Sequence, residues 1–293
     1  MPGAPTSPVR LATRGSAQAR TQAQAVADAL TAATGCTTEL VLVETTGDRR
    51  QDVPLHVIGG QGVFVKEVQQ AVLDGRADAA VHSAKDLPSV SHEALVVGAF
   101  LARRDPADAL VGRALADLAP GATVASGSVR RRAQLAELRP DLAFTELRGN
   151  IATRLAKIPD GGAIVMAVAA LQVLGMTEHV AERLPPDRFV PAVGQGCVAV
   201  EVRADDAATR ELLAAVDDPT TRHQVEVERS YLAELGTGCS LPLGAHVDGS
   251  TLYTFLAGAD GTIARDAVAL GLDQGDHELA RRAARSARDA VGA

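Results

Sequence analysis

Aromatic residues are scarce in this sequence. There is no tryptophan among the 293 residues, and phenylalanine and tyrosine together make up 2%. Proteins that bind single-stranded nucleic acids stack bases on aromatic rings and present a basic face. Because this chain has few such rings and a net charge of −7, its composition argues against a nucleic-acid partner.

Cysteine is also scarce, and long hydrophobic runs are absent. The cysteines Cys36, Cys197 and Cys239 are odd in number and have no metal-type spacing, which argues against a disulfide framework or a zinc site. No stretch of about 18 apolar residues occurs, and residues 1–8 have neither a basic flank nor an apolar run. We therefore expect a cytoplasmic protein with no signal peptide, no membrane partner and no metal.

The cations are nearly all arginine, since Lys66, Lys85 and Lys157 are the only lysines. Arginine offers a planar fork of donors that matches a carboxylate. Several arginines fall where predicted strands lead into predicted helices, and backbone N–H groups at helix starts also attract anions. These arginines are Arg14, Arg130, Arg131, Arg132, Arg148 and Arg154. Jointly they predict a cleft for a ligand rich in carboxylates, whereas a single one could be a solvated surface residue.

Apolar periodicity predicts strands and helices that alternate along most of the chain. The expected strands are 9–12, 40–43, 78–82, 123–126, 144–147, 163–168 and 197–202. Ser16 is expected to cap the first helix. The other expected helices are 64–72, 129–138, 151–157, a segment ending at 235, and 279–291, with a hairpin turning at Asp260-Gly261. The β-α-β rhythm predicts mainly parallel sheets.

The apolar share of 46% allows more than one buried core. The strand at 197–202 is expected to cross back into the first unit, because two crossovers are usual in two-lobed ligand clefts. We therefore predict an α/β fold of two periplasmic-binding-protein-like βαβ lobes around a cleft, with a small α+β C-terminal domain. The predicted boundaries are 1–101 with 197–216 for the first lobe, 105–193 for the second, and 219–293 for the C-terminal domain.

Two places in the sequence could carry chemistry. Lys85-Asp86 follows strand 78–82 at its carboxyl end, where open α/β sheets place their ligands. Asp86 could be an acid or hydrogen-bond acceptor, or only an N-cap or a surface ion pair with Lys85. Cys239 stands in a loop flanked by glycines, which leave its sulfur little cover. It could be a covalent attachment point or a small buried apolar residue.

Seven short motifs, spread over nearly the whole chain, occur in the order found in the porphobilinogen deaminase (hydroxymethylbilane synthase) family. They are Ala12-Thr13-Arg14-x-Ser16, Thr46-Gly47-Asp48, His82-Ser83-x-Lys85-Asp86-x-Pro88, Ser128-x-Arg130-Arg131, Leu147-Arg148-Gly149-Asn150-x-x-Thr153-Arg154, Pro191-Ala192-Val193-Gly194-Gln195-Gly196 and Gly238-Cys239. Each motif alone is weak, but seven in register are specific. The chain therefore resembles that family.

The resemblance implies a transferase of tetrapyrrole (porphyrin and heme) biosynthesis. Such an enzyme joins four porphobilinogen molecules head to tail into linear hydroxymethylbilane, with loss of ammonia from each. One dipyrromethane cofactor per chain, attached to Cys239 by a thioether, would prime the reaction and stay bound after the product is hydrolysed off. The implied state is a monomer, whose product passes to the next tetrapyrrole enzyme.

The resemblance also implies roles for individual residues. Asp86 and Lys85 would be catalytic, with Asp86 facing the pyrrole N–H groups and stabilising positive charge in the transition state. The cofactor would be held by Cys239, Ser83, Lys85, Asp86, Ser128, Arg130, Arg131, Arg148 and Gly149. The substrate would be bound by Arg14, Ser16, Arg148, Arg154 and Gln195.

Four positions depart from the family pattern. Gly127 stands where the family commonly has serine, Val57 and Gln61 stand where it often has lysine, and Val173 stands where some relatives have arginine. These changes touch the holding of carboxylates and would affect the rate or the number of pyrroles added. Two alternatives stay open: a diverged deaminase paralogue that builds a different oligopyrrole, and a non-enzymatic two-lobed anion-binding protein.

Overall fold

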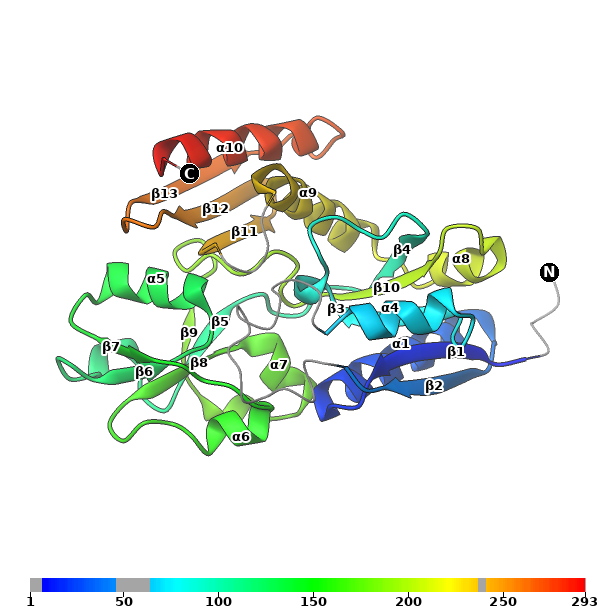
Figure 1. Ribbon diagram of the computed structural model, residues 1–293, viewed down its shortest axis with the longest axis horizontal. Coiled ribbons are helices and arrows are strands. Elements are labelled where there is room, and N and C mark those ends of the chain that lie inside the picture. Colours follow the sequence, from blue (N-terminus) through cyan, green and yellow to red (C-terminus); the bar gives the residue numbers. More distant parts are fainter. Residues whose placement is uncertain (1–6, 46–63, 237–240, 293) are drawn as a thin grey trace. The chain divides into compact units, whose positions relative to one another are not determined.

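The computed structural model describes residues 7–45, 64–236 and 241–292 (Figure 1). They form two compact units. One unit comprises residues 7–45, 64–104 and 197–222, and the other comprises 105–196, 223–236 and 241–292. Within these described ranges, no helix is long and apolar enough to cross a membrane. The division into three domains stays a prediction.

The first unit is built on a five-stranded sheet with the order β2-β1-β3-β10-β4. Its strands are β1 (Val9–Arg14), β2 (Thr38–Val43), β3 (Ala79–Ser83), β4 (Leu95–Phe100) and β10 (Val198–Arg203). Its helices are α1 (Ala17–Thr34), α4 (Lys66–Leu73) and α8 (Ala207–Ala214). Val26 and Leu30 of α1 pack with Leu11 and Val200 of the sheet, and all four are fully buried. The predicted return strand is confirmed as β10, which pairs with β3 and β4.

The second unit contains another five-stranded sheet, with the order β7-β6-β8-β5-β9. Its strands are β5 (Asp108–Val111), β6 (Thr123–Ala125), β7 (Ala143–Thr145), β8 (Ala163–Ala167) and β9 (Val180–Leu184). Its helices are α5 (Val129–Leu138), α6 (Ile151–Leu155) and α7 (Val168–Val173). Leu135 on the inner face of α5 packs with Leu110, Val124 and Val165 of the sheet. These helices and the strands before them match the β-α-β rhythm of the sequence.

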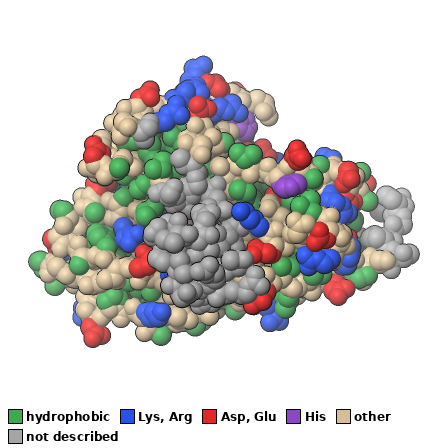
Figure 2. All heavy atoms as spheres, viewed as in Figure 1, with side chains coloured by type: hydrophobic (Ala, Val, Ile, Leu, Met, Phe, Trp, Pro, Cys, Tyr) green, Lys and Arg blue, Asp and Glu red, His purple; other side chains and the backbone are tan. Residues whose placement is uncertain are grey.

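A third, antiparallel sheet of order β11-β12-β13 also lies in the second unit. Its strands are β11 (Leu243–Asp248), β12 (Thr251–Ala257) and β13 (Ile263–Ala269), with helices α9 (Pro219–Leu235) and α10 (Asp276–Ala290). Tyr231, Leu252 and Ala284 are fully buried in its core. Charged side chains of both signs cover the outer face of α10 (Figure 2), where Arg285 pairs with Glu278. The α/β class with a small α+β C-terminal part is confirmed.

The prediction of mainly parallel sheets holds for four of the five strands in each five-stranded sheet, and one strand in each is reversed. In the first sheet β10 runs antiparallel to β3 and β4, and in the second sheet β5 runs antiparallel to β8 and β9. Strands β5 and β10 are the first strands after the chain passes from one unit to the other. They do not arrive through a β-α-β crossover, so they need not run parallel to their neighbours. Strands β4, β5, β9 and β11 had no counterpart among the predicted elements.

Candidate active site

Asp86 lies where the sequence placed it, immediately after a buried strand. It ends the 3-10 turn Ala84–Asp86, which follows β3. The Ala84 N–H donates to the Cys197 carbonyl at 2.9 Å, and the Leu87 N–H donates to the Ala84 carbonyl at 3.2 Å. The turn is anchored by the buried side chains of Ala84 and Leu87, while Lys85 and Asp86 are half-buried. The carboxylate is thus fixed at the end of the strand and remains reachable.

The residues before Asp86 bond to their own unit. The Nε2 atom of buried His82 lies 3.1 Å from Glu201 Oε2, and this oxygen accepts a hydrogen bond from Gln69 Nε2 at 2.8 Å. Ser83 Oγ donates to Gln22 Oε1 at 3.0 Å. Glu201 was missed by sequence analysis, although a carboxylate in the apolar run of β10 is an unusual feature. The polar layer formed by these side chains supports the strand that presents Asp86.

Arg14 and Ser16 mark the junction between β1 and α1. Ser16 caps α1 as predicted, and its hydroxyl accepts from the Ala19 N–H at 3.3 Å. The guanidinium carbon of Arg14 lies 4.0 Å from the centroid of the Phe64 ring, a cation–π contact. Arg14 is half-buried. The ring therefore fixes the direction of the Arg14 side chain.

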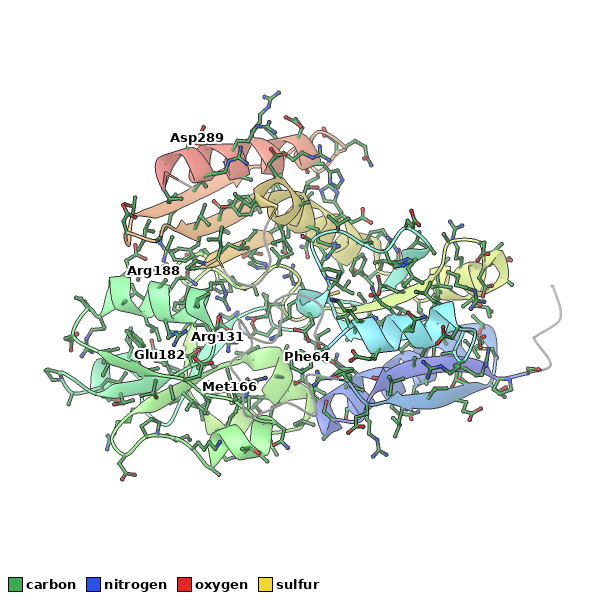
Figure 3. All side chains as sticks on the ribbon, in the orientation of Figure 1. Phe64, Arg131, Met166, Glu182, Arg188 and Asp289 are labelled. Atoms are coloured by element: carbon green, nitrogen blue, oxygen red, sulfur yellow. The ribbon has the colours of Figure 1, made fainter. Side chains whose placement is uncertain are left out.

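Arg130 and Arg131 share a carboxylate of their own chain, Asp108, which is fully buried on β5. Arg130 Nη2 donates to Asp108 Oδ2 at 2.8 Å, and Arg131 Nη2 and Nε donate to Asp108 Oδ1 at 2.6 and 3.0 Å. Arg131 extends from the first turn of α5 toward β5 and β8 (Figure 3), where its Nη1 donates to the Val165 carbonyl. Arg130 Nη1 donates to the Val190 carbonyl at 2.6 Å. Both guanidinium groups are nearly inaccessible to solvent.

Gln195 joins the same cluster. Its Nε2 donates to Asp108 Oδ1 at 3.0 Å and to the Pro106 carbonyl at 2.7 Å, and its side chain is buried. Asp108, the residue that brings the two arginines and Gln195 together, was not predicted from the sequence. The signal available was an aspartate at the start of an apolar run that continues to Val111.

Burial alone would raise the pKa of Asp108, but Arg130 and Arg131 outweigh it and lower the pKa from 3.8 to about 2. A carboxylate with a depressed pKa stabilises the fold above its unfolded pKa, and this contribution is lost as the pH falls through its folded value. We therefore expect about 2 kcal/mol of the free energy of unfolding to disappear between about pH 4 and pH 2. Urea unfolding across this range measures it. Asp108→Asn should lack this part of the pH dependence, and an unchanged slope would contradict the assignment.

Arg148 and Arg154 flank the start of α6. Asn150 caps this helix by accepting from the Thr153 N–H at 2.9 Å, and Arg154 Nε donates to the Gly149 carbonyl at 2.8 Å. Gly149 has φ +120°, and a Cβ there would lie 2.7 Å from Thr153 Cγ2. Only glycine fits this turn without strain. The turn therefore places two half-buried arginines on either side of one helix start.

Ser128 caps α5 and accepts from the Arg131 N–H at 3.4 Å. This bond ties the start of the helix to the backbone of the buried arginine pair. The predicted site residue Cys239 lies outside the described residues, as do Val57 and Gln61 and the motif at 46–48. The cysteines within the described ranges, Cys36 and Cys197, are both buried.

Residues 9–211 match the family model described as porphobilinogen deaminase, dipyromethane cofactor binding domain. The chain belongs to the porphobilinogen deaminase family. It is 45% identical to a porphobilinogen deaminase of Syntrophobacter fumaroxidans over 263 residues, which cover 86% of this chain and 85% of that one. It is 48% identical to that of Acidothermus cellulolyticus over 248 residues, covering 82% and 75%. The family membership predicted from seven motifs is confirmed.

Two departures from the porphobilinogen deaminase pattern lie within the described residues. Val173 is the last residue of α7 and is half-buried. Gly127 lies in the turn between β6 and α5, where an added Cβ would be 2.8 Å from the Leu147 carbonyl oxygen and 2.9 Å from Glu146 Oε1. A carbonyl oxygen in the backbone has little room to move. A side chain at position 127 would therefore have to displace the backbone of the neighbouring segment.

Restoring the serine common in the family is therefore expected to cost stability. Gly127→Ser should lower the free energy of unfolding by about 1–3 kcal/mol, since the Leu147 segment must shift to admit the side chain. Urea unfolding monitored by circular dichroism measures the change. Gly15→Ser is the matched control, because a Cβ there meets no atom within 4 Å. A Gly127→Ser protein as stable as that control would show that the turn relaxes freely.

Proposed function

We propose that this chain catalyses the deaminating polymerisation of four porphobilinogen molecules into linear hydroxymethylbilane. The observation that carries the proposal is the family match over residues 9–211 together with 45% identity over most of the chain. The buried arginine pair supports it, because each pyrrole of the substrate bears two carboxylate side chains. A substrate of this kind needs fixed cations along its path.

The dipyrromethane would be attached to Cys239 and would supply a carbon nucleophile for the first addition. Its carboxylates fit the donors that the chain offers. One carboxylate, Asp108, stands against two guanidinium groups, so the cluster of these three side chains has a net charge of one positive. A buried excess of positive charge is stabilised by an anion. Ser83, Lys85, Ser128, Arg148 and Gly149 would complete the holding of the cofactor.

Asp86 would accept hydrogen bonds from the pyrrole N–H groups of the reacting rings. When the C–N bond of the aminomethyl group breaks and ammonia leaves, positive charge spreads over the pyrrole, and a fixed carboxylate stabilises it. When the new C–C bond forms, the attacking carbon loses a proton, which Asp86 would accept or pass to water. Lys85 would pair with a substrate carboxylate beside it.

Porphobilinogen and the growing chain would be bound through their carboxylates. The residues proposed for this task are Arg14, Ser16, Arg148, Arg154 and Gln195. Ser16 and Gln195 also serve the fold, through the α1 cap and the bond to Asp108. We further propose that the chain acts as a monomer in the cytoplasm and that its product passes to the next tetrapyrrole enzyme.

Product stoichiometry tests the proposal. Purified protein mixed with porphobilinogen should release four ammonia molecules for each linear tetrapyrrole formed, as measured by an ammonia assay and by mass spectrometry of the product. A different ratio, with a shorter or longer oligopyrrole, would identify a diverged paralogue. Binding of porphobilinogen with no release of ammonia would overturn the proposal in favour of a non-enzymatic anion-binding protein.

A further inference from the structure

The cluster around Asp108 contains hydrogen bonds to other segments of the chain in addition to its two ion pairs. Its two carboxylate oxygens accept four hydrogen bonds from the side chains of Arg130, Arg131 and Gln195. Backbone carbonyls of Val190 and Val165 take one further N–H from each guanidinium group. Three partners on different segments, Asp108 and the carbonyls of Val165 and Val190, thus determine the position of both guanidinium groups. Such a cluster is rigid before any ligand arrives.

The cluster carries one more positive charge than negative charge, because two arginines share one aspartate. Burial lowers the pKa of Arg130, Asp108 opposes this shift, and neighbouring Arg131 adds to it. Without Asp108, two guanidinium groups would be buried beside one another with no counter-charge, which is a strongly unfavourable arrangement. With it, one positive charge remains, and the bonds above engage fewer than the five N–H groups of each guanidinium. The remaining charge and donors suit one further carboxylate.

We propose that Asp108 is a positioning residue for cofactor assembly: it holds Arg130 and Arg131 in the arrangement that receives one carboxylate of the dipyrromethane. The inference rests on the proposed function. Asp108 does not itself touch the ligand, since its oxygens are occupied by the chain's own donors. It acts by holding Arg130 and Arg131 close together and by fixing the orientation of their guanidinium groups.

A second buried carboxylate joins this cluster to the helix that leads toward Cys239. Glu228 on α9 accepts from the Gly194 N–H at 2.8 Å, next to Gln195, and from the Val247 N–H at 2.9 Å. Helix α9 ends at Leu235, four residues before the attachment cysteine. The turn at Gly194-Gln195 therefore bonds to Glu228 on one side and to Asp108 on the other. This continuity supports a role for the cluster in cofactor assembly.

The test measures covalent loading of apoprotein produced in cells that make no porphobilinogen. Apoprotein is mixed with porphobilinogen, and the appearance of the dipyrromethane mass increment is followed by intact-mass spectrometry on the folded fraction. Asp108→Asn should load about tenfold more slowly or worse, because the buried arginines lose their shared partner. Asp105→Asn is the matched control, since Asp105 pairs with the exposed Arg183. It should load within about twofold of the wild type.

A double-mutant cycle separates positioning from a general loss of stability. If Asp108 acts through the arginines, adding Asp108→Asn to an Arg131→Gln protein should slow loading by less than about twofold more. The proposal would be overturned if Asp108→Asn slowed loading by the same factor in the Arg131→Gln protein as in the wild type. So would an Asp108→Asn protein that is folded and loads at the wild-type rate.

If Asp108→Asn does not fold, the wild-type apoprotein decides the matter. Its Arg131 Nε–H should give a slowly exchanging NMR signal before cofactor is added, assigned by its disappearance in Arg131→Lys. A signal lost to rapid exchange, as for a surface arginine, would overturn the proposal. Failure of the proposed function has a different signature: wild-type protein that never gains the dipyrromethane increment, whatever the state of Arg131.

Discussion

Replacing Cys239 by alanine is expected to leave a folded protein whose intact mass equals that of the polypeptide alone. Without the thiol there is no thioether, and a cofactor held only by ion pairs would leave with the product. Turnover of porphobilinogen should fall by about a thousandfold or more. Cys36 and Cys197 are buried at 1% and 2% exposure, so neither offers a substitute attachment point. Intact-mass spectrometry and an ammonia-release assay measure both effects.

Cys36→Ala is the control for that experiment, since it removes a thiol from the core of the first unit and leaves the proposed attachment point unchanged. It should retain the full mass increment and the wild-type rate. A dipyrromethane increment that persists in Cys239→Ala would contradict the assignment of the attachment point.

Asp86→Asn is expected to lower kcat by about a hundredfold or more while changing the free energy of unfolding by less than about 1 kcal/mol. The amide keeps the shape of the side chain but does not stabilise positive charge or accept a proton. The fold should tolerate the change, because the turn is anchored by Ala84 and Leu87 rather than by the carboxylate. Single-turnover kinetics with porphobilinogen, together with urea unfolding, separate the two effects.

A surface aspartate of the same unit provides the comparison for Asp86. Asp74 is the C-cap of α4, and its exposed carboxylate accepts from Gln70 Nε2 at 2.6 Å and pairs with Arg76 at 3.4 Å. Asp74→Asn should have the wild-type kcat. If Asp86→Asn were as active as Asp74→Asn, Asp86 would be a structural residue and not a catalytic one.

Local signals in the sequence predicted much of the fold. Ser16 caps the first helix because its hydroxyl and the following apolar spacing act within a few residues of each other. Helix α5 was predicted over its full length, 129–138, for the same reason. Pairings between distant segments were harder to predict. Strands β4, β5 and β9 were not predicted, and each of them pairs with a partner strand that lies far along the chain.

The candidate site shows the same division between local and distant signals. Asp86 was found from its position after a strand, which the structure confirms. Arg130 and Arg131 were predicted to bind the cofactor, but their burial was not foreseen. Their partner Asp108 lies more than twenty residues away and belongs to no local motif. The apolar run after Asp108 is a sign of burial, but the pairing of Asp108 with the two arginines is found only in the folded structure.

At position 127 the structure adds a packing constraint that the sequence does not show. From the sequence alone, Gly127 indicates only that the serine hydroxyl common in the family is missing. The structure places the Leu147 carbonyl where a side chain would be. Glycine at position 127 lacks a hydroxyl donor for a carboxylate, but it lets the Leu147 carbonyl approach closely. We therefore expect the glycine to stabilise the fold of this chain, even though it removes a possible ligand contact.

Native mass spectrometry of the wild-type protein, as purified and after mixing with limiting porphobilinogen, tests the central claim most directly. We expect the purified protein to exceed its polypeptide mass by one dipyrromethane. Limiting substrate should then add a series of one to three pyrrole units, and a fourth addition should be followed by return to the starting mass. Wild-type protein that turns over porphobilinogen with no covalent increment at any stage would contradict the account.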